Sequence, residues 1–169
     1  YTFYHSGKEW TGVPIMASNM DTTGTFEMHK ELSLHGMVTC IARHYNTDGK
    51  KWNQAERKNK LCVMSGISNT EISEIIGVAT TFPDVAFVGL DVANGYTINF
   101  VEAIKHLREQ LPSVTIIAGN VVTADMTAEL ILAGADIVKV GIGGGSVCTT
   151  RIKTGVGYPQ LSAVIECAD

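Results

Sequence analysis

The sequence lacks any apolar run near the roughly 18 residues that a membrane-spanning helix requires. It also lacks a basic stripe, and its formal net charge is −4 at pH 7. Such a chain has no electrostatic footprint for nucleic acid or for acidic membranes, so neither is expected as a partner. No charged and then apolar leader opens the chain, which begins at Tyr1 rather than at Met. We therefore expect it to be a piece of a longer protein.

Cysteine is scarce and scattered. The four cysteines are Cys40, Cys62, Cys148 and Cys167, and no two of them have the spacing of a zinc site or of a disulfide framework. Reduced thiols are typical of the cytoplasm, which is the location we expect. With 169 residues and 45% hydrophobic content, the chain can bury a core of its own, so a single domain is predicted.

Short apolar runs recur along the chain at intervals of roughly 24 residues, with one longer step, which indicates repeated supersecondary units. The runs begin at Val13, Met37, Leu61, Val85, Val114 and Ile137. The segments between them favour helices over 25–35, 47–59, 69–80, 96–111, 123–133 and 158–168. In the fourth of these, Ile98, Val101, Ile104 and Leu111 share one helical face. Asn69 or Thr70, and Thr123, are the predicted caps of their helices.

Apolar strands that alternate with helices imply a parallel sheet buried on both faces. A doubly wound sheet would show a glycine-rich fingerprint after its first strand, and the residues at 17–20 include no glycine. The even spacing instead favours a (β/α)8 barrel, also called a TIM barrel, whose sites lie at the carboxyl ends of the strands. We predict a partial TIM barrel, with an N-terminal hairpin at 1–12 and six of the eight βα units at 13–169.

The sixth apolar run ends in a loop that reads GIGGGSVCTTR over 141–151. Glycines let the backbone approach an anion or coordinate a cation. A thiol among backbone amides and near Arg151 loses its proton more readily than a free cysteine. Cys148 is therefore a candidate nucleophile, and its alternative reading is a small buried filler.

The other strands also end in polar residues. Asp91 lies inside an apolar run and would be costly to bury without a partner, so it is a functional candidate. Asp21 and Asn94 are predicted to cap helices. Arg43 and His44 either bind an anion or are solvated, and the remaining histidines, His5, His29, His35 and His106, are expected on the surface.

Five stretches of the sequence together resemble the family that contains GMP reductase and IMP dehydrogenase. They are ASNMDTTGTFEM, GLDVANGY, AGNVVTADM, ELILAGADIVKVGIGGGSVCTTR and KTGVGYPQLSAVIECAD. The resemblance implies a TIM barrel with a catalytic cysteine after the sixth strand. The run after Cys148 is similar to the reductase branch. The connection at 46–60 is also too short for the regulatory insert that most of the dehydrogenases carry.

The resemblance further implies a reaction and a set of roles. The reaction is the NADPH-dependent reductive deamination of GMP to IMP and ammonia, in purine nucleotide salvage, through a thioimidate on Cys148. The implied roles are catalysis for Cys148 and Thr150, substrate binding for Met20 and Ser146, cofactor binding for Arg43, Asp91, Val92, Ala93 and Gly143, and binding of a monovalent cation, potassium, by Gly143, Gly145, Cys148 and Arg151. The family also suggests a homotetramer.

The chain departs from the family pattern at several points. Gly144 stands where the family usually has proline, which would stiffen the loop. Ala42 and Arg43 stand where the reductases generally have histidine and lysine. The family's second phosphate-binding loop, its mobile flap and its general-acid glutamate fall beyond Asp169, so this piece alone is expected to be inactive.

Three alternatives follow from these departures and from the strand pattern. The first is an IMP dehydrogenase without a regulatory insert, and the second is a non-catalytic relative that binds nucleotide. The third is a lyase or aldolase in which Lys139, on the sixth strand, forms a Schiff base.

Overall fold

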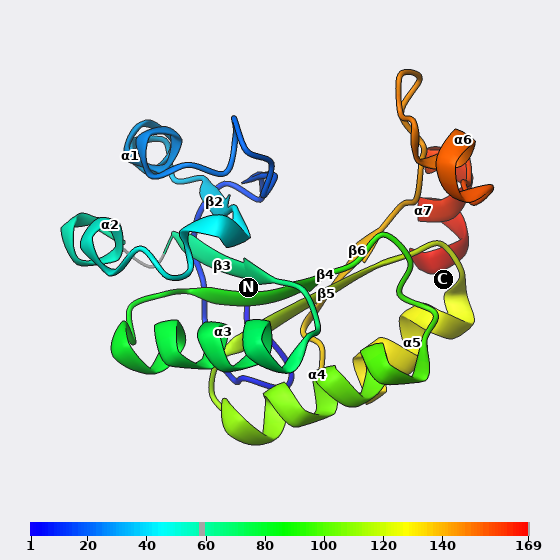
Figure 1. Ribbon diagram of the computed structural model, residues 1–169. Coiled ribbons are helices and arrows are strands. Elements are labelled where there is room, and N and C mark those ends of the chain that lie inside the picture. The colour runs from blue at the N-terminus through cyan, green and yellow to red at the C-terminus, as the bar shows by residue number, and fades with distance from the viewer. Residues whose placement is uncertain (58–59, 169) are drawn as a thin grey trace.

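A computed structural model describes residues 1–57 and 60–168. Its centre is one sheet in which each strand pairs in parallel with the next along the chain, in the order β1 to β6. The strands are β1 Met16–Ala17, β2 Val38–Ile41, β3 Leu61–Ser65, β4 Phe87–Asp91, β5 Thr115–Val121 and β6 Ile137–Val140. The sheet curls into an open half-barrel (Figure 1). The predicted partial TIM barrel with parallel strands is confirmed.

Helices follow the strands, and the longer ones cover the convex face of the sheet (Figure 1). They are α1 Phe26–Leu34, α2 Gly49–Gln54, α3 Asn69–Thr81, α4 Ile98–Gln110, α5 Ala124–Leu132, α6 Thr150–Thr154 and α7 Gln160–Ala168, with a 3₁₀ turn, η1, at Arg43–Tyr45. The helix predicted over 47–59 is shorter than expected, and its last two predicted residues lie outside the described part of the chain. Helix α6 and turn η1 were not predicted. None of the helices in the described residues is long and apolar enough to cross a bilayer.

Short polar side chains fix where three of these helices begin. Thr25, Ser68 and Thr97 each accept a hydrogen bond from a backbone N–H in the first turn of α1, α3 and α4 respectively. The cap predicted at Asn69 or Thr70 is therefore wrong by one or two positions, because Ser68 and Glu71 form a reciprocal capping box.

Three other predicted caps also differ from the structure. Asn94 caps no helix, because Thr97 begins α4 and the side-chain oxygen of Asn94 accepts the backbone N–H of Tyr96 at 3.1 Å. Asp21 caps no helix, since Thr25 fills that role and the carboxylate of Asp21 lies 3.6 Å from the ring of His44. Thr123 occupies the N-cap position of α5, but its hydroxyl contacts the hydroxyl of Tyr96 at 3.0 Å and not the helix backbone.

Strands β2 to β5 are buried on both faces, and their successive side chains point to opposite sides. Leu61 and Val63 face the helices in the larger core, whereas Cys62 and Met64 face the inside of the half-barrel. Full burial of each large apolar side chain contributes roughly 1.5–3 kcal/mol. The carboxyl ends of the strands are thereby held on a rigid support.

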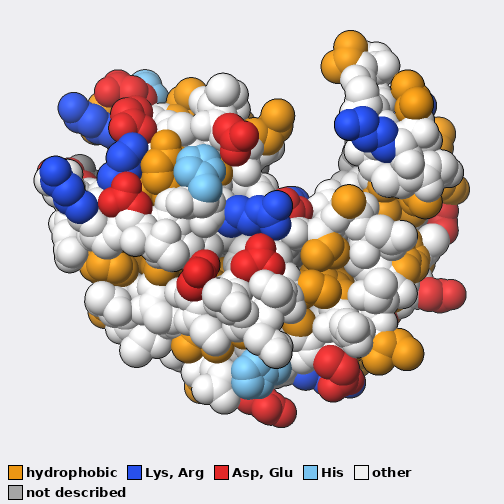
Figure 2. Space-filling view, viewed as in Figure 1, with side chains coloured by type: hydrophobic (Ala, Val, Ile, Leu, Met, Phe, Trp, Pro, Cys, Tyr) orange, Lys and Arg blue, Asp and Glu red, His pale blue; other side chains and the backbone are white. Residues whose placement is uncertain are grey.

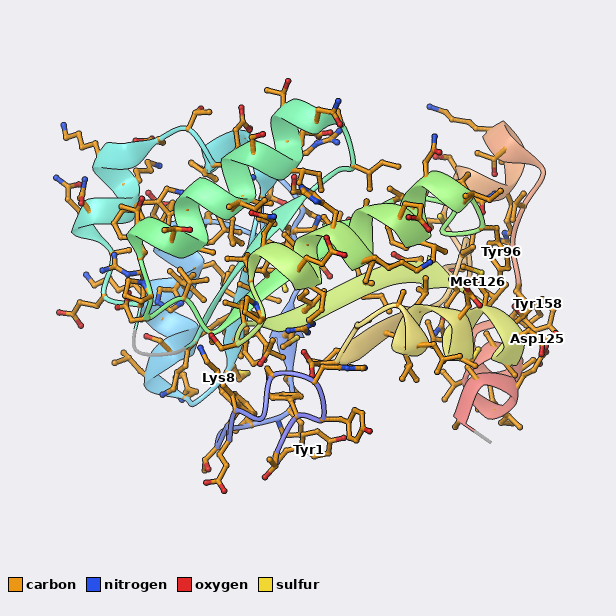
Figure 3. The ribbon with its side chains drawn as sticks, turned by 90° about the horizontal axis from the view of Figure 1, so that it is seen from below. Tyr1, Lys8, Tyr96, Asp125, Met126 and Tyr158 are labelled. Atoms are coloured by element: carbon orange, nitrogen blue, oxygen red, sulfur yellow. The ribbon has the colours of Figure 1, made fainter. Side chains whose placement is uncertain are left out.

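The first residues of the chain fold back on themselves and lie against the amino ends of the strands. Thr2 and Glu9 form an antiparallel bridge, and the rings of Phe3 and Trp10 meet the ring of Phe87 edge-on, with centroids 5.8 and 5.9 Å away. Figure 3 shows this segment, which carries the labels Tyr1 and Lys8, beneath the sheet.

One of the histidines expected on the surface is buried. His29, on α1, is 2% exposed, and its Nε2 lies 2.8 Å from the carbonyl oxygen of Glu56. The prediction is wrong there because the segment after α2 packs over α1 and covers the ring. No local sequence pattern predicts the contact between His29 and Glu56.

Candidate active site

A groove of about 860 Å³ lies at the carboxyl ends of the first four strands. It is lined by Asn19, Asp21, Ala42, Arg43, Ser65, Gly66, Ile67, Ser68, Glu71, Asp91, Val92, Ala93 and Asn99. Figure 2 shows this face hollowed between the lobe that holds α1 and α2 and the arm that carries α6. The carboxyl rim is where TIM barrels place their sites. Four of the predicted cofactor-binding residues line this groove: Arg43, Asp91, Val92 and Ala93.

Asp91, the carboxylate inside the apolar run, has the partner that its position requires. Its Oδ2 accepts a hydrogen bond from Nδ2 of Asn19 at 2.7 Å, and its Oδ1 contacts the ammonium of Lys139. Asn19 comes from the end of β1 and Lys139 from β6, so the three side chains span the inside of the half-barrel. Lys139 thus serves as the counter-ion of Asp91.

Arg43 lies at the rim of the groove, in the turn directly after β2. Its Nη1 is 3.1 Å from Oε1 of Glu71, in the first turn of α3. The pKa of the Glu71 carboxyl is lowered, first by the hydrogen bond from the hydroxyl of Ser68 and then by backbone N–H groups and the charge of Arg43. Within the described residues, the charged partner of Arg43 is thus a carboxylate.

Cys148 lies on the glycine-rich loop between β6 and α6, on the arm of the molecule (Figure 1). Its Sγ is 3.3 Å from the hydroxyl oxygen of Thr150, and its backbone N–H donates to the carbonyl of Gly145. The pKa of the Cys148 thiol is lowered, first by the hydroxyl of Thr150, then by the backbone of Thr150, and last by the charge of Arg151. These groups favour the thiolate, which is the nucleophilic form.

The loop owes its path to glycine and to one glutamine. Gly141 and Gly143 have φ values of 132° and 61°, which L side chains rarely adopt. A Cβ at Gly141 would lie 2.2 Å from Oε1 of Gln160, and Nε2 of Gln160 donates to the carbonyl of Val140 at 2.9 Å. Gln160, the first residue of α7, thus links the start of that helix to the end of β6, where the loop begins.

Several predicted site residues lie outside the groove. Gly143, Ser146 and Cys148 are on the loop, and Met20 is 63% exposed beside the end of β1. The structure therefore brings together four of the five predicted cofactor residues in the groove, and the predicted nucleophile with Thr150 and Gly143 on the loop. It does not place Met20 or Ser146 in contact with Cys148.

Sequence reasoning placed Asn19 at the carboxyl rim but did not find its bond to Asp91. It missed Glu71 in the groove, Lys139 as counter-ion, and Gln160 beneath the loop. One signal for Glu71 was available, because serine followed three residues later by glutamate is the sequence signature of a capping box. The other contacts join residues at least 20 positions apart, and nothing local marks them.

One of the predicted cation ligands already has hydrogen-bond partners within the loop. The carbonyl oxygen of Gly145 accepts hydrogen bonds from the backbone N–H of Cys148 and from Nη2 of Arg151, at 3.1 and 3.3 Å. A cation bound there would have to displace a guanidinium of the same charge. Within residues 1–57 and 60–168, no group of three or more His, Cys, Asp or Glu side chains could hold a metal ion either.

Comparison with known proteins places this geometry in a family. The IMP dehydrogenase / GMP reductase domain matches residues 10–169. The chain is 53% identical to a GMP reductase of Vibrio vulnificus strain YJ016 and 52% identical to GMP reductase 1 of Homo sapiens, and each match covers all of this chain and 50% of the relative. The chain thus spans about half the length of the curated relatives it matches.

A solved structure shows the same fold. The crystal structure of inosine 5′-monophosphate dehydrogenase from Legionella pneumophila superposes with a TM-score of 0.84 at 32% identity, over 92% of this chain and 48% of that one. Its agreement with the half-barrel, and the domain match over nearly the whole chain, lead to one conclusion. The chain belongs to the IMP dehydrogenase / GMP reductase family.

Proposed function

We propose that this chain carries the nucleophile and the cofactor groove of a GMP reductase, an NADPH-dependent oxidoreductase of purine nucleotide salvage. The observation that carries the proposal is Cys148, whose thiol lies 3.3 Å from the Thr150 hydroxyl on a glycine-rich loop. Identity of 52–53% to proteins named GMP reductase supports the same reading.

The chemistry follows from the thiolate. Sγ of Cys148 attacks C2 of the purine of GMP, the C2–N bond to the exocyclic amine breaks, and ammonia leaves. The Thr150 hydroxyl, placed beside the sulfur, assists protonation of the departing amine. The product is a thioimidate, in which C2 is bonded to the sulfur, so a difficult substitution is divided into two easier steps. NADPH, when bound, supplies the hydride to C2. The C2–S bond then breaks, Cys148 recovers its electron pair as thiolate, and IMP leaves.

The groove is suited in size and chemistry to a nicotinamide dinucleotide. Ligand pockets have volumes of roughly 300–1,000 Å³, and this groove measures about 860 Å³. The guanidinium of Arg43 is suited to a phosphate, and Val92 and Ala93 offer an apolar edge next to Asp91. Gly143 is proposed to complete the cofactor site from the loop. Met20 would pack on the purine base, and Ser146 would contact the phosphate of GMP.

A potassium ion at Gly143, Gly145, Cys148 and Arg151, a homotetramer and a cytoplasmic location complete the proposal. Binding of the cation requires the Gly145 carbonyl to lose its hydrogen bond from the guanidinium of Arg151. The proposed steps of the reaction do not involve the cation.

IMP dehydrogenase is the second candidate, since the solved structure that matches this fold is one. The higher identity to GMP reductases favours the reductase. The lyase alternative loses support from the contact between the ammonium of Lys139 and Asp91.

Ammonia release by the full-length protein tests the proposal. We expect ammonia from GMP with NADPH, and no NADH from IMP with NAD⁺. Cys148→Ala should lower the rate by about 10³-fold or more, because the nucleophile is removed. Cys167→Ala, at the partly buried cysteine of α7, is the matched control and should retain activity. Mass spectrometry that finds the nucleotide adduct on the Cys148 peptide would support the thioimidate. An active protein with an adduct on another cysteine would refute it.

A further inference from the structure

The ion pair between Arg43 and Glu71 occupies the rim of the cofactor groove. The two side chains meet at 3.1 Å, and their exposures differ: 68% for Arg43 and 28% for Glu71. Arginine is the side chain in this groove best suited to bind phosphate. In the structure it is bound to a carboxylate of the groove itself.

Glu71 is the fixed partner of the pair. Its Oε2 accepts hydrogen bonds from the hydroxyl and the backbone N–H of Ser68, at 2.7 and 3.1 Å. A Cβ at position 66 would lie only 2.5 Å from the same oxygen, so the glycine at that position makes room for the carboxylate. Arg43, on its long exposed stem, is therefore the partner that can move.

Two other charged side chains of the groove have partners outside this pair. Asp91 is matched by Lys139 and Asp21 by the ring of His44 at 3.6 Å. A phosphate that binds Arg43 must take the guanidinium from Glu71 and then lie near a carboxylate of like charge. Both effects oppose phosphate binding.

We propose that Glu71 competes with a phosphate group of the dinucleotide for Arg43 and so limits the affinity of the groove for its cofactor. The inference rests on the proposed function, since it takes a nicotinamide dinucleotide as the ligand. The phosphate is either the 2′-phosphate, which NADPH has and NADH lacks, or the diphosphate that both share. The chemistry at Arg43 is the same in both cases.

Glu71→Gln tests the competition in the full-length protein, with dissociation constants for NADPH and NADH measured by fluorescence titration without GMP. Glutamine at this position keeps the capping box, so the helix start is preserved while the charge is removed. We expect NADPH to bind about threefold more tightly, as for release from an exposed ion pair. An effect on NADPH alone identifies the 2′-phosphate, and an equal effect on NADH identifies the diphosphate. Unchanged or weaker binding of both would overturn the proposal.

Two further variants separate this effect from a general change in charge. Glu74→Gln removes a carboxylate from the same helix outside the groove lining, and it should leave both dissociation constants unchanged. In an Arg43→Ala background, Glu71→Gln should give no more than a small part of its gain, because the competition needs the guanidinium. A full gain there would contradict the proposal.

The outcome is also distinct from failure of the proposed function. A protein that binds NADPH and releases ammonia from GMP, but whose affinity is unmoved by Glu71→Gln, would refute the competition alone. A protein that releases no ammonia would refute the proposed function, and the binding titrations would still measure whether Glu71 opposes the cofactor.

Discussion

At position 148 the chain holds a thiol that is easier to ionise than an ordinary cysteine. The hydroxyl of Thr150 and its backbone lie on one side, and the charge of Arg151 adds to their effect. Each of these groups stabilises the thiolate more than the thiol. The loop therefore favours the thiolate form, which the proposed attack on the nucleotide requires.

Replacement of Thr150 should raise the pKa of the Cys148 thiol. In Thr150→Val, the hydroxyl that lowers the pKa of Cys148 most strongly is gone, so the pKa should rise toward the ordinary value. The rate of alkylation by iodoacetamide, followed against pH on the Cys148 peptide, should then reach its midpoint at a higher pH than in the unaltered protein. Thr149→Val, at the adjacent exposed threonine, is the control. A midpoint that stays in place in Thr150→Val would mean that the hydroxyl does not stabilise the thiolate.

The strands and helices show which features of the fold the sequence pattern predicts. The apolar period located the strands of the described sheet, because the runs are continuous and β2 to β5 are buried along nearly their whole length. The first run, from Val13, gave only a two-residue, half-buried strand at Met16–Ala17. In α4 the predicted face was partly wrong: Ile98 is 81% exposed, while Phe100 and Leu107 are buried.

The reason for the error in α4 is positional. Ile98 is the first residue of that helix and is exposed, although Phe100 in the same turn is buried, so helical periodicity alone cannot tell a covered position at a helix end from an open one. Similarly, α6 was not predicted because its five residues are too few for an apolar pattern. The same limit applies to the site. The glycine-rich sequence predicts the loop and Cys148, but no local pattern predicts the contacts that Asn19, Lys139 and Gln160 make.

The start of α3 allows a direct test of an element boundary. The Ser68 hydroxyl accepts the backbone N–H of Glu71 and donates to its carboxylate. Ser68→Ala removes both contacts and should lower the free energy of unfolding by about 1 kcal/mol. Ser73→Ala, inside the same helix and exposed, should change it by less than about 0.5 kcal/mol. Urea unfolding of the full-length protein followed by circular dichroism measures both. Equal midpoints for the two variants would show that Ser68 does not cap the helix.

On the scale of the whole molecule, one carboxylate joins parts of the chain that are far apart in sequence. The side chain of Asp136 is fully buried just before β6, and it accepts hydrogen bonds from the backbone N–H groups of His5, Ser6 and Ile116. His5 and Ser6 donate to Oδ1, whereas Oδ2 accepts from Ile116 and pairs with Nη2 of Arg108 at 2.6 Å. The amino-terminal segment, β5, β6 and α4 therefore share one anchor. Sequence reasoning did not find it, because its partners lie up to 131 positions away.

Removal of this anchor should weaken the whole molecule. Asp136→Ala leaves Arg108, which is 16% exposed, without its counter-ion and orphans three backbone donors. Breaking a buried pair in this way costs about 3–5 kcal/mol. Asp125→Ala, at an exposed position in the first turn of α5 (labelled in Figure 3), should cost less than about 1 kcal/mol. Urea unfolding of the full-length protein compares the two.

Because the anchor also holds the first residues, limited proteolysis should cleave the segment around Tyr4 sooner in Asp136→Ala than in Asp125→Ala. Equal stability and equal cleavage would show that the hairpin is held to the barrel by its other contacts, among them the rings of Phe3, Trp10 and Phe87.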